Sequence, residues 1–159
     1  MKLMASLAAI VFVGLISFAQ TAEDPLANIT DDSLKSTVIT MKRTGCYGTC
    51  PAYHVEIHGD GTVMYTGLSY VAVPGEKNYT IPVSDVRKLL EKFQKTYFFS
   101  LNDSYVGTRT DYPSTTVTIT INGKTKSVYD YIAGPKSLKD LQNYIDEIAK
   151  LDELVKRKK

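Results

Sequence analysis

The chain has 159 residues, of which 43% are hydrophobic and 23% are charged, and its formal net charge is +2. This length and composition fit one globular domain that buries a real core. The near balance of charge excludes the broad basic field with which proteins bind nucleic acid, so we expect no nucleic-acid partner.

The first residues have the pattern of an export signal. Lys2 supplies a positive charge, residues 7–18 are apolar, and Ser17-Phe18-Ala19 places small residues where signal peptidase cleaves. A retained membrane anchor is the competing interpretation, but it needs about 20 apolar residues, more than this run contains. We therefore predict a signal peptide over residues 1–19 and a secreted or periplasmic product that does not span the membrane.

The rest of the chain divides into three parts. Residues 20–36 are polar, with Asp24-Pro25 and Asp31-Asp32, and are typical of a linker or loose arm. Strand and helix patterns begin at Thr37, so residues 37–156 are predicted to form a single domain. Residues 157–159 are a basic tail of the kind that commonly continues a solvated helix end.

Two strands are predicted over residues 38–43 and 52–58. The second alternates, with Tyr53, Val55 and Ile57 on one face and His54, Glu56 and His58 on the other. A two-residue turn after it would place Val63 and Tyr65 beside the histidines. A three-residue loop over residues 59–61, with Gly61 left-handed, keeps them on the apolar face, and we predict that loop.

Further hairpins are predicted around Pro74-Gly75 and across Asn122-Gly123. Ser84 and Ser137 are the predicted N-caps of two amphipathic helices. The second of these carries apolar residues at helical spacing as far as Val155. The sequence therefore predicts an α+β fold: an antiparallel sheet of about six strands built from hairpins, with both helices packed on one face.

Both cysteines lie in the segment Gly45-Cys46-Tyr47-Gly48-Thr49-Cys50-Pro51. The glycines permit sharp turns and Pro51 disfavours helix at Cys50, which predicts a tight loop between strands. In an oxidising compartment Cys46 and Cys50 should form a structural disulfide. The alternative is a thiol-redox pair, but redox pairs usually have two intervening residues and a thiol at a helix N-terminus.

Cys46, Cys50, His54 and His58 recur every four residues, which raises the question of a metal site. On a strand these side chains spread over roughly 13 Å, too far for one zinc ion to gather them. We therefore expect neither a metal site nor a cofactor. The sequence also contains no familiar catalytic motif, so no catalytic residue is predicted, and enzymatic activity stays open with a non-enzymatic role favoured.

A candidate binding surface follows from the two loops. A bridged 46–50 loop would display Tyr47 and Thr49 with little conformational entropy left to lose on binding. The polar segment over residues 102–114 is longer than most connections and contains Asp111. If that segment lies at the same end of the sheet, Asp111 joins Tyr47 and Thr49 in one surface.

Several motifs occur in a fixed order: Gly45-Cys46-x-Gly48-x-Cys50-Pro51-x-Tyr53, Asp60-Gly61-x-Val63-x-Tyr65, Phe98-Phe99, Thr110-Asp111-x-Pro113 and Asn122-Gly123-Lys124-Thr125-Lys126. In these motifs, over residues 38–148, the chain resembles an exported bacterial family known as a domain of unknown function. The resemblance implies fold and export and supplies no activity, substrate or cofactor.

We predict an exported binding or cell-envelope-associated module with a structural disulfide, whose partner is a protein or an envelope component. Two alternatives stay open at this point. One is a thiol-redox protein that uses Cys46 and Cys50, and the other is a secreted inhibitor of another protein.

Overall fold

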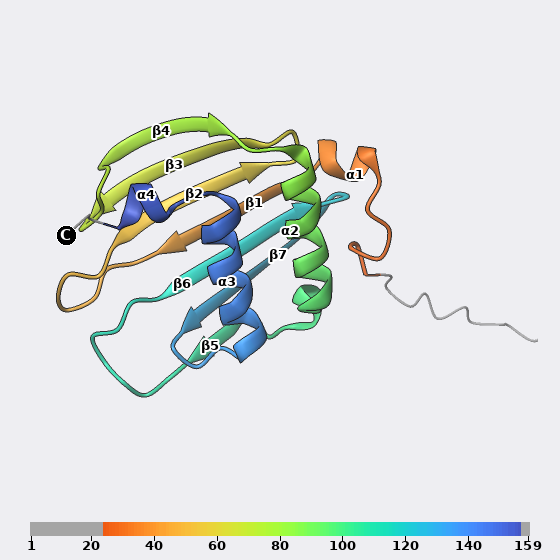
Figure 1. The fold of residues 1–159 in the computed structure, drawn as a ribbon. Helices are drawn as coiled ribbons and strands as arrows, with labels where there is room; N and C mark the ends of the chain where they lie inside the picture. The colour runs from red at the N-terminus through yellow and green to blue at the C-terminus, as the bar shows by residue number, and fades with distance from the viewer. Residues whose placement is uncertain (1–23, 157–159) are drawn as a thin grey trace, which may run out of the picture.

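A computed structural model describes residues 24–156 of the chain. The predicted signal peptide (1–19) and the predicted basic tail (157–159) lie outside these residues. One sheet contains the strands β1 (Val38–Arg43), β2 (Ala52–His58), β3 (Thr62–Ser69), β4 (Gly75–Thr80), β5 (Ser104–Val106), β6 (Thr115–Ile121) and β7 (Lys124–Tyr131). Their order is β4-β3-β2-β1-β6-β7-β5, so β4 and β5 are the edge strands (Figure 1).

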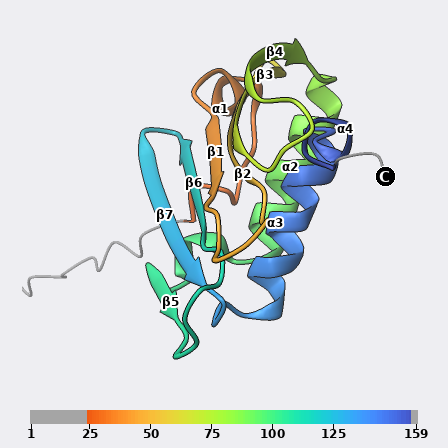
Figure 2. The ribbon, with the colours of Figure 1, turned by 90° about the vertical axis from the view of Figure 1, so that its left-hand side faces the viewer.

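The helices are α1 (Asp31–Lys35), α2 (Val83–Lys95), α3 (Lys136–Ile148) and α4 (Asp152–Val155), with a short 3-10 helix at Phe98–Ser100. Helices α2 and α3 lie on one face of the sheet, as Figure 2 shows when the sheet is viewed from the side. The hydrophobic core fills the space between these two helices and the sheet. Its largest fully buried side chains include Tyr65, Phe93 and Phe98.

The α+β class and the largely antiparallel sheet agree with the prediction, but the sheet has seven strands rather than about six. One strand that the sequence does not predict is β5, which pairs in parallel with β7 inside the segment predicted as a polar loop. Three residues are too few to show an alternating pattern, so the sequence gives no sign of this strand. The hairpin predicted around Pro74-Gly75 is formed by β3 and β4, and residues 70–74 are its connection rather than a strand.

The turn after β2 is the predicted three-residue loop. Gly61 has a φ of 89°, and the register places Val63 opposite Ile57 and Tyr65 opposite Val55. All four side chains are buried, whereas His54 and His58 lie on the opposite face. The turn between β6 and β7 has two residues, Asn122 and Gly123, both with positive φ as a type I′ hairpin requires.

Gly61 should tolerate alanine much less well than Gly75. Both have a left-handed φ, 89° and 84°, so alanine strains both backbones by about 1–2 kcal/mol. A Cβ on Gly61 would also lie 2.2 Å from the Ile81 carbonyl oxygen, whereas a Cβ on Gly75 meets nothing within 4 Å. In urea unfolding, we expect Gly61→Ala to lower the free energy of unfolding more than Gly75→Ala does, by more than about 1 kcal/mol. Equal losses would mean that the close approach at Gly61 is absent.

The two long helices begin two residues earlier than predicted, and no serine caps them. Pro82 and Pro135 occupy the N-cap positions, without a side-chain hydrogen bond to the helix. Ser84 and Ser137 lie within the first turns. The fixed φ of proline already suits entry into a helix, which explains why a serine cap is not required.

The apolar pattern predicted to continue to Val155 is divided between α3 and α4. Lys150 has a φ of 54°, and the Leu151 N–H donates to the Asp146 carbonyl at 2.9 Å. The Lys150 N–H donates to the Glu147 carbonyl at 3.0 Å, which completes a Schellman motif. This turn ends α3, and α4 then runs along the end of the sheet.

The described part of the predicted linker, residues 24–36, packs against the domain. Leu26 has 0% exposure and Leu34 6%, and both belong to the core cluster. Thr30 caps α1 through a reciprocal capping box with Ser33. The Asn122 side chain donates to the Pro25 carbonyl at 3.2 Å and ties the segment to the β6–β7 turn.

Candidate functional site

The disulfide loop and the segment before β6 lie side by side at one end of the sheet. Cys46 and Cys50 are bridged, with their Cα atoms 5.5 Å apart. The Thr44 N–H donates to the Ser114 carbonyl at 3.0 Å, and the Tyr47 N–H donates to the Asp111 carbonyl at 3.2 Å. The structure therefore brings together the two segments whose adjacency the sequence left open.

These two segments form a surface that we call the loop surface: Tyr47, Thr49, Asp111 and Tyr112. The Tyr47 side chain is 91% exposed and that of Tyr112 is 46% exposed, while Thr49 and Asp111 are also exposed. Asp111 has a φ of 67°, a conformation that aspartate tolerates better than most residues. The backbone bonds described above hold this surface in place although its side chains face solvent.

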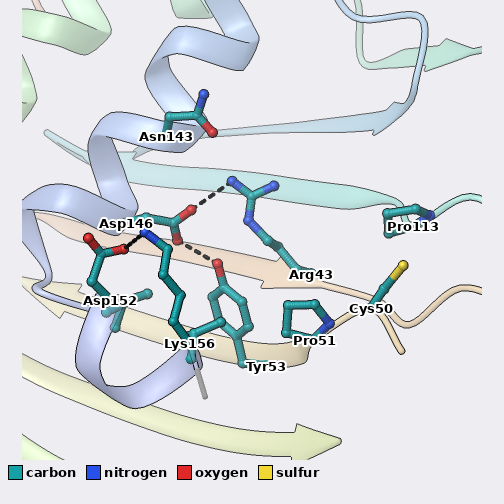
Figure 3. Close-up of a pocket in the computed structure, with 11 residues that line it drawn as sticks. Arg43, Cys50, Pro51, Tyr53, Pro113, Asn143, Asp146, Asp152 and Lys156 are labelled. Carbon is teal, nitrogen blue, oxygen red and sulfur yellow. Dashed lines mark hydrogen bonds and ion pairs between the residues drawn. The ribbon is translucent and has the colours of Figure 1, made fainter. Parts of the chain in front are cut away.

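Behind the disulfide loop lies a network of three polar side chains from β1, β2 and α3 (Figure 3). Arg43 Nη2 lies 2.8 Å from Asp146 Oδ2, and the Tyr53 hydroxyl donates to Asp146 Oδ1 at 2.6 Å. Arg43 Nη1 also donates to Thr115 Oγ1 at 3.1 Å. Both oxygens of the Asp146 carboxylate therefore have partners, and the network fastens α3 to the centre of the sheet.

Burial dominates the electrostatics of this network. It raises the pKa of the Tyr53 hydroxyl well above its usual range, although the Arg43 cation opposes this. Burial also raises the pKa of the Asp146 carboxyl, against the opposing effects of Arg43 and Tyr53. Burial alone would lower the pKa of Arg43, but the charge of Asp146, the Tyr53 oxygen and the hydrogen bonds to both together outweigh burial, and the pKa is raised. The tyrosine thus stays protonated and acts as a hydrogen-bond donor to the carboxylate.

The network forms the floor of a groove made of three adjoining pockets. The central pocket, of about 360 Å³, is lined by Arg43, Cys50, Pro51, Tyr53, Pro113, Asn143, Asp146, Leu151, Asp152, Val155 and Lys156. A pocket of about 500 Å³ beside Tyr70 shares Pro51, Val155 and Lys156 with it. A third, of about 260 Å³ beside Tyr112, shares Arg43, Pro113 and Asn143. We call these three pockets together the groove.

Asp130 of β7 fixes the entry to α3 at the far end of the groove. Its side chain is 3% exposed and accepts hydrogen bonds from the Gly134 N–H at 2.7 Å and from Gln142 Nε2 at 3.1 Å. Lys139 Nζ lies 3.3 Å from the same carboxylate. A buried carboxylate with these three partners is well compensated, so this residue holds the groove wall in place.

The histidines lie away from the groove, on the outer face of the sheet. His58 Nε2 is 2.7 Å from Glu56 Oε1. Within residues 24–156 there is no group of three or more histidine, cysteine, aspartate or glutamate side chains placed to hold a metal ion. Over the same residues, none of the helices combines the length and the apolar character that crossing a membrane requires.

Sequence reasoning misses the Arg43–Tyr53–Asp146 network. The alternation places Tyr53 on the apolar face of its strand, and Arg43 is the last residue of a predicted strand. Asp146 lies 103 residues from Arg43 and 93 from Tyr53 along the chain. The one local signal is a carboxylate within the apolar spacing of the last helix, next to Ile145.

Replacing both cysteines by serine should lower the free energy of unfolding by about 2 kcal/mol, because the bridge closes a short loop. Urea unfolding should show this loss, and the wild-type protein in reducing agent should match the double variant. The native protein should also have a mass about two protons lower than the reduced form. Two freely alkylated thiols in native protein would contradict the bridge.

The structure defines a small α+β domain with a seven-stranded sheet and a disulfide-bridged loop at one end. Residues 37–149 match the DUF6438 domain of unknown function, and the chain belongs to that family. No curated protein matches the chain.

Proposed function

We propose that the protein is an exported, non-enzymatic binding module that presents the loop surface to a protein or to another component of the cell envelope. The observation that carries this proposal is the hydrogen bond from the Tyr47 N–H to the Asp111 carbonyl, at 3.2 Å. It joins two segments distant in sequence into one exposed, aromatic and polar surface.

The loop surface has the physical properties of a recognition surface. Tyr47 is 91% exposed, yet its backbone is held by the disulfide and by Asp111. A preformed loop loses little conformational entropy on binding, so more of the contact energy remains as affinity. Tyrosine also combines a large apolar ring with a hydroxyl, which makes it frequent among the residues that dominate interface energies.

The surroundings of the cysteines favour a structural role over thiol-redox chemistry. The element that follows Cys50 is the strand β2, so no helix N-terminus lies after the pair to stabilise a thiolate. The polar side chains behind the loop are likewise engaged with one another, since Asp146 accepts bonds from both Arg43 and Tyr53. These features support a binding module more than a redox protein.

The experiment introduces a photo-crosslinking amino acid at position 47 in cells that produce the protein. We expect one defined adduct with an envelope component and no adduct when the label replaces Tyr129, on the outer sheet face. Tyr47→Ala combined with Asp111→Asn should abolish capture of the same component by the purified protein. Asparagine at position 111 keeps the left-handed backbone favourable.

The double variant must have the same unfolding midpoint as the wild type, so that loss of capture reflects a lost contact and not a lost fold. A folded double variant that captures the same component equally well would place the binding surface elsewhere. Export is checked in the same cells by N-terminal sequencing of the secreted or periplasmic protein, which should lack residues 1–19. An uncleaved cytoplasmic product would contradict the export part of the proposal.

A further inference from the structure

We propose that the groove binds an extended segment of polypeptide and accepts one apolar side chain in its central pocket. This inference rests on the proposed function as a binding module and identifies the chemistry of the partner. Cys50 and Pro51 line the central pocket (Figure 3), and Thr49 and Tyr112 of the loop surface line the two end pockets. A chain bound in the groove would therefore lie next to the loop surface.

The shape of the groove suits an extended chain. Three pockets adjoin in the order Tyr70 end, centre, Tyr112 end, because each end pocket shares residues with the central one. A strand rises about 3.3 Å per residue, and alternate side chains point to the same side. Side chains at alternate positions of an extended peptide can therefore enter successive pockets, while a compact ligand would fill only one.

The central pocket favours an apolar side chain. Pro51, Pro113, Leu151 and Val155 contribute apolar walls, and both carboxylate oxygens of Asp146 already accept hydrogen bonds. A sugar ring placed here would bury hydroxyl groups against these apolar walls and beside a carboxylate whose oxygens already have partners. A hydroxyl that faces these walls would lose hydrogen bonds with water and gain none from them, whereas an apolar side chain has none to lose.

The charges of the groove indicate a neutral occupant. Arg43 pairs with Asp146 at 2.8 Å, Lys156 with Asp152 at 2.7 Å, and Lys139 with Asp130 at 3.3 Å. Each cation that lines the groove therefore has a carboxylate partner within it. An anionic polymer would gain no net attraction and would compete with these pairs, so an uncharged stretch of peptide is the complementary partner.

The rim offers groups that suit a peptide main chain. Asn143 is exposed on α3 above Arg43, and its amide carries both a donor and an acceptor. Thr49 lines the pocket at the Tyr70 end with a hydroxyl that can also donate or accept. A main chain laid between these two positions meets polar groups at the rim while its side chains point down.

The test uses the purified protein and a phage-displayed library of random peptides of about ten residues, which extend to roughly 33 Å. We expect enriched peptides to share one aromatic or large aliphatic residue flanked by uncharged residues. Amide NMR shifts on titration with an enriched peptide should cluster at Arg43, Asn143 and Val155. Asn143→Trp, which covers the central pocket, should weaken binding by at least about tenfold.

Glu91→Trp is the matched control, since it places the same side chain at an exposed position of α2 outside the groove. It should bind the peptide as the wild type does. The proposal fails if no peptide is enriched, if the shifts map to the outer sheet face, or if folded Asn143→Trp binds at wild-type affinity. If Asn143→Trp does not fold, the shift map of the wild type alone decides.

A neutral chito-oligosaccharide is titrated in parallel. If the sugar produces the groove shifts and no peptide does, the occupant is a glycan and the proposal is overturned. Tyr47→Ala separates this inference from the proposed function, because Tyr47 does not line the groove. That variant should lose the envelope component but keep peptide binding. If Tyr47→Ala still captures the envelope component and also binds the peptide, the proposed role of the loop surface is wrong and the groove proposal stands.

Discussion

Replacing Asp146 by alanine should destabilise the protein by about 3–5 kcal/mol, because it leaves a buried guanidinium without its carboxylate. The side chains of Arg43 and Asp146 are only 22% and 24% exposed, so water replaces the lost partner poorly. The Tyr53 hydroxyl loses its 2.6 Å acceptor in the same change. Urea unfolding followed by circular dichroism measures the loss.

The matched control removes the whole network at once. Arg43→Met, Tyr53→Phe and Asp146→Leu together replace three polar groups by apolar ones of similar size. Replacing a buried ion pair by apolar residues is often neutral or stabilising, so the triple variant should be clearly more stable than Asp146→Ala. If Asp146→Ala costs less than about 1 kcal/mol, the pair behaves as an ordinary surface pair and does not fasten α3 to the sheet.

Leu26→Ala should cost about 2–5 kcal/mol, the range for truncating a fully buried leucine. Leu26 has 0% exposure and packs in the core cluster, although it lies in a segment whose composition is that of a linker. Thermal and urea unfolding should both register the loss. Leu68→Ala is the control, because Leu68 is 56% exposed and its truncation should change stability by no more than about 0.5 kcal/mol.

A near-zero effect of Leu26→Ala would mean that residues 24–36 are dispensable for the fold, as a linker would be. A deletion variant makes the same distinction. Deleting residues 20–30 removes Leu26 and the Thr30 cap of α1, and we expect it to be at least as destabilising as the point substitution.

The sequence predicts those parts of the fold that local residue patterns determine. The Gly59–Gly61 loop follows from the alternation of side chains along a strand. A three-residue turn puts Val63 and Ile57 on the same face, whereas a two-residue turn does not. The stripe of α2 is equally local. In contrast, Leu26 has only Ala27 and Ile29 as apolar neighbours in a short polar segment, and β5 has three residues. Neither segment is long enough to show a periodic apolar pattern.

The candidate site likewise has a part that the sequence predicts and a part that depends on the tertiary structure. The sequence indicates the disulfide loop through its glycines and Pro51, and the structure contains the bridge. The adjacency of Tyr47 and Asp111, the Arg43–Tyr53–Asp146 network and the groove all depend on which strands become neighbours. The Lys150 turn that separates α3 from α4 is also hidden, because no glycine stands at the left-handed position.

The position of β4 at one edge of the sheet bears on self-assembly (Figure 1). An edge strand offers unpaired backbone groups on its free side, and long flat edges template aggregation. Here Glu76 and Lys77 are exposed on β4, and burying their charges in a strand-to-strand contact would be unfavourable. The opposite edge, β5, offers only three residues. Strand addition between copies is therefore discouraged at both edges of the sheet, and the domain is protected against assembly through its edge strands.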